Sequence, residues 1–541
     1  MSIPCLHRAS TVTWTVLFMG AAACPAFAAN GSERPKLFVP VSKTFSSDQL
    51  DSLLIQRPAL ANHARRTAPA AIDLAALTSS GQPSAVLVEL NLFPDVKFDA
   101  LLHRTQADGS GDVHLAGRIE GVEGSCVIIV LHEGAVAGSI TVPGVGLFDL
   151  KPLGNGVALV REIDLSDRAG QNCGAIDLPQ LARPRQTGHP GVTESGEPDP
   201  AAMSRKSTVD DEGSPRGVGA SICPTEFTSL GGFVADTNSV VELMVYYTPA
   251  ALLAAGNLAN LEAEIDVAVD YANQAYDNSD IDVTLSVIRV ASISYNEGPD
   301  PFEALDRLVS IDDGHLDTVH ADRDQYGGDL VTLWVGNTIT AGGVAYQLYN
   351  VNPYDDGRYG FSVMREDNAT LPTLAHELGH NFGCQHDRCN PGGSPFFDFA
   401  WGFRQRCEVA EPPPCTTPWP CEPNKDIMAY PPGITVPYFS NPNIIVGDQP
   451  IGGTDEHGGW CDNAATHNLT AFTIANFRPS QVTPLPPSRI YVNAAAAPGG
   501  NGSSWATALK DVQAGIGLAV RSRGAVQEVW VAAGTYYPDR G

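Results

Sequence analysis

Hydrophobic and polar positions alternate in short runs over the first third of the chain. From Gly117 to Asp164, apolar-rich runs are separated by turn residues every eight to twelve positions, and this spacing predicts an antiparallel meander of strands. We therefore expect residues 29–185 to form one β-rich domain. Residues 186–222 are poor in apolar side chains and rich in Pro, Gly, Ser and charge, which predicts a processing region or a plain solvated linker.

The pattern changes after residue 239 to strands that alternate with helices. Four apolar runs predict strands, at 240–247, 283–290, 329–336 and 342–348. Apolar residues at helical spacing predict an amphipathic helix over 258–277, and a further helical stretch starts at Asp462. This order predicts a multidomain chain in which residues 223–478 form an α/β (α+β) domain with a mixed sheet.

The end of the chain is set apart by a Pro-rich linker at 479–488. Residues 489–541 contain the segments IYV, GGNGSSWATAL and VWVAAGTYYP, which resemble the start of a right-handed parallel β-helix. One coil of such a helix cannot bury its own face. If this resemblance holds, we expect a partial β-helix-like module whose chain continues beyond residue 541.

The first 28 residues have the pattern of a secretory signal peptide. His7 and Arg8 precede an apolar run at 12–23, and Ala26-Phe27-Ala28 fits the small-x-small cleavage rule. A lipoprotein site at Cys24 is the alternative, although the leading leucine of such sites is absent. No later stretch is long and apolar enough to span a membrane. We expect a secreted protein, in the extracellular space or at the cell surface.

The negative net charge of the chain makes some kinds of binding partner unfavourable. The formal charge of −28 comes from 33 Lys and Arg against 61 Asp and Glu. Such a surface repels nucleic acid and anionic membranes, so we expect no nucleic-acid partner and a soluble, monomeric protein. Nine cysteines follow the signal peptide, six of them between 384 and 461. In an oxidising compartment this density predicts disulfide bonds, with one thiol left over.

The candidate chemistry lies in LAHELGHNFGCQHD, residues 374–387. His376 and His380 are four residues apart, so on a helix both imidazoles can reach one metal ion. Glu377 adjoins the first histidine and can approach the open position of the ion without being a ligand. This nitrogen-rich set favours one Zn²⁺ with a place left for water. An HExxH sequence alone also occurs by chance, so the neighbouring residues matter.

Those neighbours supply a third ligand. Gly383 can adopt positive φ and end the helix, so that the chain turns back and aims His386 at the same ion. Pro372 lies at the other end of the helix, in its first turn, where its missing N–H costs nothing. We predict a metal site made of His376, His380 and His386.

Residues 376–386 resemble the metzincin zinc signature, and Asp387 after the third histidine is typical of the reprolysin (adamalysin) branch. The segment DIMAY, residues 426–430, resembles the Met-turn of that family, with Met428 beneath the metal. With FSNPNI, DNA and ANFR further on, the stretch from about 235 to 480 resembles bacterial reprolysin-like and peptidyl-Asp metallopeptidase-like secreted enzymes. The resemblance implies a zinc endopeptidase with Glu377 as general base.

Two further roles follow from the resemblance only. Tyr430 stands where astacins and serralysins carry a tyrosine that binds zinc or stabilises the oxyanion, whereas reprolysins usually lack it; a plainly packed tyrosine is the alternative. Related enzymes bind substrate along an edge strand, for which 342–348 is the candidate, with Gly343, Val344 and Ala345 as its contact residues.

A secreted protease must be kept inactive before export, and residues 29–222 have the composition and position of a propeptide. Cys173 in NCGAIDLP resembles the Cys-Gly switch whose thiolate caps zinc in some metzincins. A disulfide from Cys173 to Cys126 or to Cys223 is the favoured alternative.

The sequence thus predicts a zinc metalloendopeptidase that hydrolyses protein or peptide substrates. The alternative is a catalytically inactive secreted adhesin or binding protein that keeps a structural zinc. Nothing in the sequence supports Ca²⁺ as a second cofactor.

Overall fold

The computed structural model describes residues 34–41, 47–73, 86–106, 112–164, 174–176, 239–348, 357–405, 424–454, 460–478, 489–496, 504–509, 512, 528–534 and 536. The predicted signal peptide and the predicted linkers at 186–222 and 479–488 lie outside this set, so the domain boundaries stay predictions. No helix within the described ranges combines the length and the hydropathy needed to cross a membrane.

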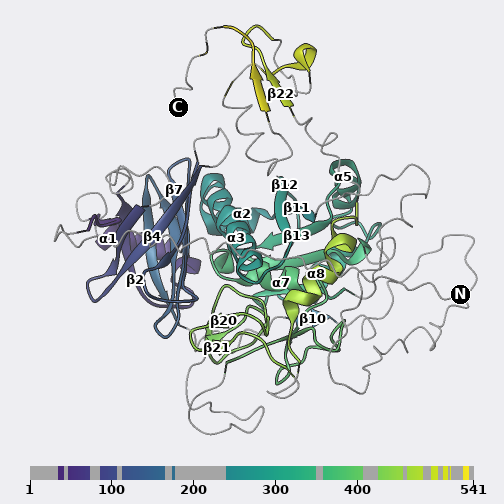
Figure 1. Ribbon diagram of the computed structural model, residues 1–541, viewed down its shortest axis with the longest axis horizontal. Coiled ribbons are helices and arrows are strands. Elements are labelled where there is room, and N and C mark those ends of the chain that lie inside the picture. Colours follow the sequence, from purple (N-terminus) through teal and green to yellow (C-terminus); the bar gives the residue numbers. More distant parts are fainter. Residues whose placement is uncertain are drawn as a thin grey trace, which may run out of the picture. The chain divides into compact units, whose positions relative to one another are not determined.

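The N-terminal region folds into a nine-stranded sheet in the order β1-β2-β9-β8-β7-β6-β5-β4-β3 (Figure 1). Each strand pairs antiparallel with its neighbours. The strands are β1 Phe38–Pro40, β2 Ala64–Ile72, β3 Val86–Phe93, β4 Val96–Gln106, β5 Val113–Ile119, β6 Cys126–His132, β7 Ala135–Val142, β8 Gly146–Gly154 and β9 Val157–Ile163. Helix α1 (Ser47–Gln56) precedes β2. The predicted β-rich meander is therefore confirmed.

Strand β6 is buried on both faces because two different cores meet there. Val127 and Ile129 point into the core of the N-terminal sheet. Side chains on a strand alternate between its faces, and Ile128 and Val130 accordingly pack with helix α3 (Leu258–Asn278) of the following region. The N-terminal sheet is thus held against α3 by apolar contacts. Each large aliphatic side chain buried in this way stabilises the fold by about 1.5–3 kcal/mol.

The second region is built on a six-stranded sheet in the order β10-β14-β15-β13-β11-β12. Its strands are β10 Gly174–Ile176, β11 Val240–Tyr247, β12 Thr284–Ser292, β13 Leu330–Val335, β14 Gly343–Tyr346 and β15 Phe361–Arg365. Strands β11, β12, β13 and β15 are parallel to one another, whereas β14 runs antiparallel to β15. The four predicted strands and the mixed sheet are confirmed.

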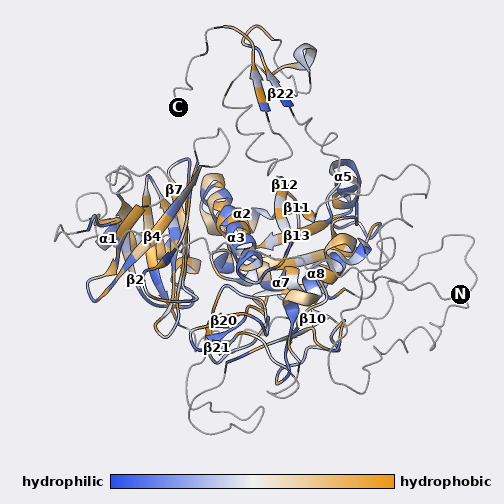
Figure 2. Ribbon diagram, in the orientation of Figure 1, coloured by the Kyte–Doolittle hydropathy of each residue, from blue (hydrophilic) through white to orange (hydrophobic). Residues whose placement is uncertain are grey.

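Helices cover both faces of this sheet. Leu243 and Val245 of β11 pack in one core with residues of α3, α7 (Thr373–Asn381) and α8 (Asn463–Ile474). Met244 and Tyr246, which point the other way, pack with α4 (Pro301–Val309) and α5 (Thr318–Tyr326). Figure 2 shows the mixed hydropathy of α3, as the predicted amphipathic helix requires. The resulting α/β/α layers place α7 beside β14 and β15.

The C-terminal residues described form a pair of parallel strands, β22 (Arg489–Val492) and β23 (Glu528–Val531). Parallel pairing is what one coil of a β-helix requires. A single ladder does not establish that fold, so the β-helix-like module stays a prediction.

The cysteines differ from expectation. Cys126, Cys384 and Cys461 are free and buried, whereas Cys389 is disulfide-bonded. The predicted alternative pairing of Cys173 with Cys126 is therefore wrong, because Cys126 packs as an apolar residue in the core beside α3. The expectation of a single thiol left over among the nine cysteines is also wrong, because Cys126, Cys384 and Cys461 are all free. Burial raises the pKa of the Cys126 and Cys461 thiols to about 12.

Two histidines of the N-terminal sheet form ion pairs with carboxylates. His114 Nδ1 on β5 lies 2.6 Å from Asp270 Oδ2 on α3. His132 Nε2 on β6 lies 3.1 Å from Glu262 Oε2 on α3, and its Nδ1 lies 3.0 Å from Asp112 Oδ2. Protonation of these imidazoles therefore strengthens the contact between the sheet and α3.

The pKa values of His114, His132 and Asp266 are all raised. Burial, the largest single effect, would lower the pKa of both His114 and His132, but the hydrogen bonds with Asp270 and Asp112 and the charges of the surrounding carboxylates together outweigh it, and both values are raised. Burial raises the pKa of Asp266, also on α3, to about 7, although His114 opposes the shift. All three groups therefore hold a proton more tightly in the folded protein than in the unfolded chain.

This cluster predicts that the free energy of unfolding falls as pH rises. A raised histidine pKa stabilises the fold fully below the unfolded value of about 6.5, and that contribution is lost as pH rises through the folded value. The raised pKa of Asp266 acts in the same direction. Melting temperatures should fall between pH 6 and pH 9, and the double variant His114→Gln, His132→Gln should flatten the slope. The exposed control His315→Gln should keep it; equal slopes in all three proteins would contradict the assignment.

Candidate active site

Helix α7 carries the first two histidines and ends where the sequence predicts. It begins after Pro372, which serves as its N-cap residue rather than lying in the first turn. At the other end, Gly383 adopts a φ of 100°. Its N–H donates to His380 O at 2.8 Å, and Cys384 N–H donates to Gly379 O at 2.9 Å. These bonds close the helix and reverse the chain. The short strand β16 (Gln385–Asp387) then carries His386.

The three predicted histidines converge on one point. Their ligand atoms all lie within 4.8 Å of one another, and His380 Nε2 is 3.1 Å from His386 Nε2. Two nitrogens bound to one tetrahedral ion at about 2.0–2.1 Å would be roughly 3.3 Å apart. The donor set and the spacing therefore fit a metal ion such as zinc.

Backbone carbonyls orient the imidazoles. His376 Nδ1 lies 2.8 Å from Ile427 O, and His380 Nδ1 lies 2.9 Å from Cys384 O. An N–H donated at Nδ1 leaves the Nε2 lone pair for a metal. Burial lowers the pKa of His380 to about 4, and burial together with the neighbouring histidines lowers the pKa of His386. Both rings are thus neutral at pH 7, which is the form that binds a metal ion.

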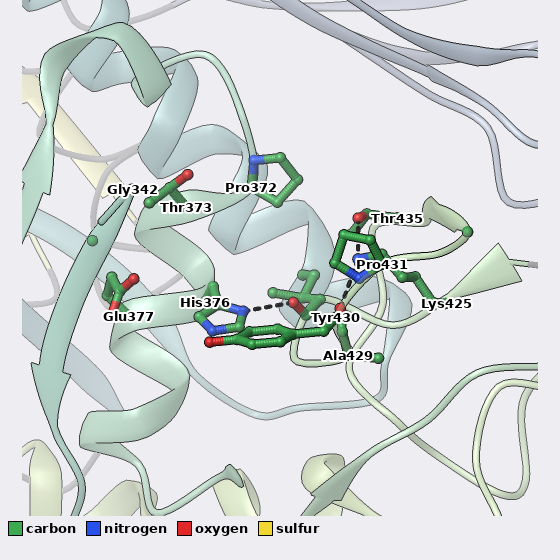
Figure 3. Close-up of a pocket in the computed structure, with 13 residues that line it drawn as sticks. Gly342, Pro372, Thr373, His376, Glu377, Lys425, Ala429, Tyr430, Pro431 and Thr435 are labelled. Carbon is green, nitrogen blue, oxygen red and sulfur yellow. Dashed lines mark hydrogen bonds between the residues drawn. The ribbon is translucent and has the colours of Figure 1, made fainter. Parts of the chain in front are cut away.

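Glu377 lies beside this cluster at the end of β14. Its side chain is 1% exposed, and a Cβ at position 343 would collide with its Oε1. Only glycine at 343 therefore leaves room for the carboxylate. Figure 3 shows Glu377, His376 and Tyr430 around one cleft, with the ring of Tyr430 alongside the imidazole of His376. The cleft has an empty volume of about 680 Å³, including space open to solvent.

The segment at 426–430 packs beneath the helix. Met428 is fully buried, and a Cβ on Gly379 would come within 2.5 Å of its Sδ. Asp426 Oδ1 accepts a hydrogen bond from Ala429 N at 2.8 Å, which closes the turn around Met428. The family resemblance places Met428 beneath the metal, and that role stays a prediction.

Asp387 ties the third histidine to that segment. Its Oδ2 accepts from Tyr430 N at 2.9 Å, and its Oδ1 accepts from Cys389 N at 3.0 Å and forms an ion pair with Arg404. The centroid of the Tyr430 ring lies 4.2 Å from that of His386. Tyr430 is therefore held beside the three histidines by its backbone as well as by its ring.

The predicted substrate-binding strand carries an unexpected neighbour. Strand β14, which contains Gly343, Val344 and Ala345, is the outermost strand of its own region, and β10 pairs with it in parallel. The register places Gly174 opposite Val344 and Ile176 opposite Tyr346. Cys173 directly precedes this strand but lies outside the described residues.

Sequence reasoning missed several residues of the cleft, among them Thr373 and Lys425. The sequence contains a clue to Lys425, because it is the only lysine between residues 223 and 478.

Comparison with known proteins agrees with this geometry. Residues 262–387 match the family model described as metallo-peptidase family M12B, reprolysin-like. A peptidyl-Asp metalloendopeptidase of Stenotrophomonas maltophilia is 28% identical over 360 residues, which cover 66% of this chain and 71% of the relative. One of Pseudomonas aeruginosa is 28% identical over 306 residues, covering 49% of this chain and 47% of the relative.

A shorter match extends to animals. Disintegrin and metalloproteinase domain-containing protein 10 of Homo sapiens is 33% identical over 111 residues, covering 18% of this chain and 15% of the relative. The family model covers the region that holds the histidine cluster. The region that holds the histidine cluster is therefore similar to reprolysin-like metallopeptidases, and the comparisons support a metalloendopeptidase.

Proposed function

We propose that this protein is a secreted zinc endopeptidase that cleaves protein substrates with an activated water. The observation that carries the proposal is the convergence of His376, His380 and His386 beside Glu377 in an open cleft. Zinc, when bound, supplies a Lewis acid that polarises a carbonyl and lowers the pKa of water to about 7. The N-terminal signal pattern supports secretion.

In this proposal Glu377 moves the protons. Its carboxylate lies beside His376 at the cleft, where it accepts a proton from the attacking water and then donates it to the leaving amine. Tyr430 faces the same cleft and donates its hydroxyl hydrogen to the carbonyl oxygen as negative charge develops there. Strand β14 binds the substrate backbone as an added strand, next to Glu377.

The N-terminal sheet and the strand that follows it act as a propeptide in this account. Strand β10 occupies the hydrogen-bonding edge of β14 that an added substrate strand would need. Substrate and β10 therefore compete for one edge, and removal of β10 activates the enzyme. A thiol switch at Cys173 stays a prediction.

The competing function is an inactive binding protein with a structural metal. Structural zinc sites usually close with four protein ligands. Within the described ranges the cluster contains three ligands, and Glu377 lies next to them. This arrangement favours the enzyme. Relatives named peptidyl-Asp metalloendopeptidases support the further proposal that cleavage occurs next to an aspartate.

The metal assignment predicts a loss of zinc from a single substitution. His386→Gln should lower bound zinc from about one ion per chain to near zero after dialysis, because two nitrogen ligands hold zinc far more weakly than three. Zinc is measured by plasma mass spectrometry, and the exposed His315→Gln serves as the control. Full zinc content in His386→Gln would contradict the ligand set.

The assignment of the base predicts a protein that keeps its metal but loses activity. Glu377→Gln should retain zinc and lower kcat by about 10²–10⁴, because the amide cannot accept the proton. Cleavage of a quenched fluorescent peptide, with and without a chelator, gives the rate. Unchanged turnover in Glu377→Gln would refute this role.

The hydroxyl of Tyr430 is tested separately from its ring. Tyr430→Phe keeps the ring packed on His386, so zinc content and melting temperature should stay the same. The loss of an oxyanion donor should lower kcat by about 10²–10³ with little change in KM. If kcat is unchanged, Tyr430 is only a packing residue.

A further inference from the structure

Two buried glutamine side chains join the end of strand β14 to the segment that carries His386. Gln347 directly follows β14 and is 5% exposed, and Gln385 is the first residue of β16 and is fully buried. Gln385 Nε2 donates to Gln347 Oε1 at 3.2 Å. The two side chains thus connect segments that are 38 residues apart in the chain.

Backbone groups at both ends complete this pair. Gln347 Nε2 donates to Gly383 O at 3.1 Å. Gln385 Oε1 accepts from His386 N at 2.9 Å and from Gly392 N at 3.2 Å. Four hydrogen bonds therefore run from the turn at Gly383, through two amides, to the third histidine and the loop after it.

The donors and acceptors along this path restrict the residue type at both positions. Each side chain accepts at its oxygen and donates at its nitrogen, which a carboxylate or an apolar side chain cannot do. An apolar side chain at position 385 would remove the acceptor of the buried His386 N–H, and an unmade bond of a buried donor costs stability. Gly383 O has a second donor, Phe396 N at 3.3 Å. Loss of Gln347 should therefore affect stability less than loss of Gln385.

These bonds fix the part of the chain that aims the third imidazole at the metal. Gln385 holds the backbone of His386 directly. Through Gly392 it also holds the loop in which the backbone of Asn390 forms a hydrogen bond with the His386 ring. A ligand that is fixed at its backbone and at its ring is preorganised for the ion.

Strand β14 has its own attachments to α7, which do not involve the glutamines. Leu348 N donates to His380 O at 3.0 Å, and Asn381 Nδ2 donates to Tyr346 O at 2.8 Å. Loss of the amide pair would therefore leave β14 beside α7 while removing a bond from His386.

We propose that Gln347 and Gln385 are positioning residues that act as one unit to hold His386 for metal binding. Among the residues that the structure describes, neither side chain lines the cleft, and both act through the backbone of the turn and of the third histidine. The pair also ties this histidine to the end of the strand that is proposed to bind substrate. This inference rests on the proposed zinc endopeptidase function and adds residues that set the geometry of its metal site.

Zinc affinity tests this role without any measurement of activity. Gln347→Met and Gln385→Met keep the length of each side chain and remove its amide. In the full-length protein, the apparent Kd for zinc, measured by competition with a chromogenic chelator, should rise about 10–100-fold in Gln385→Met. Gln347→Met should act in the same direction. Wild-type affinity in a folded Gln385→Met would overturn the proposal.

A double variant shows whether the two glutamines act as one unit. Groups that act together give non-additive effects, whereas independent groups give losses that multiply. The double variant Gln347→Met, Gln385→Met should therefore bind zinc about as weakly as Gln385→Met alone. Losses that multiply, or a Gln347→Met variant with wild-type affinity, would overturn the unit. If Gln385→Met does not fold, Gln347→Met alone decides, since it leaves the acceptor of His386 N in place.

Gln405→Met is the matched control. Gln405 is also 5% exposed, and its Nε2 also donates to backbone oxygens, those of Val446 and Gln449. This variant should lower the melting temperature but keep the zinc Kd within about twofold of the wild type. A loss of zinc affinity equal to that of Gln385→Met would mean that any buried glutamine has this effect, and would overturn the positioning role.

Kinetics at saturating zinc separate this inference from the function on which it rests. Cleavage of a quenched fluorescent peptide should show a several-fold fall in kcat in Gln385→Met with KM within about twofold of the wild type, because β14 keeps its place. An effect confined to KM would overturn the positioning role and leave the protease intact. A wild-type protein that cleaves no member of a peptide library overturns the proposed function, whereas the zinc affinities still decide the role of the glutamines.

Discussion

The reversal of the chain at Gly383 is the constraint on which the site depends. A helix that continued past this point would turn His386 away from the face shared by His376 and His380. At a φ of 100°, glycine ends α7 without the steric penalty that a side chain would bring. The next three residues then return beneath the helix, and His386 Nε2 reaches 3.1 Å from His380 Nε2. The convergence of the three histidines is thus a consequence of the backbone conformation at Gly383.

The rest of the site supports this turn by close packing. Gly379 lets the helix rest on Met428, and Gly343 lets β14 pass beside Glu377. Asp387 follows His386 directly and binds the backbone of Tyr430. A shift of the third histidine would therefore move Tyr430, and a shift of β14 would move Glu377. In the proposed mechanism, these few contacts couple metal binding, proton transfer and substrate alignment.

Features that depend on residues close together in the sequence were predicted correctly, and features that depend on distant residues were not. The histidine cluster was predictable because α7 and its end involve residues close in sequence, whose geometry the spacing of His376, His380 and Gly383 determines. The strands and helices of the α/β region were predictable for the same reason, since their periodicity is local.

Longer-range contacts were not predictable from the chain. The pairing of β10 with β14 joins segments about 170 residues apart, and no local pattern encodes it. The stretch 384–461 was expected to contain disulfides, yet Cys384 is a free thiol whose Sγ lies 3.5 Å from His467 Nδ1 in a buried core. Lys425 and Thr373 share a cleft only because the Met428 segment folds against the start of α7.

The central claim is that three imidazoles hold one zinc ion and leave a place for water. X-ray absorption spectroscopy at the zinc edge of the processed, zinc-loaded protein tests it most directly. The account predicts three nitrogen scatterers and at least one oxygen at about 2.0–2.2 Å, with no sulfur. A sulfur shell at about 2.3 Å, or a fourth imidazole in place of the oxygen, would contradict it.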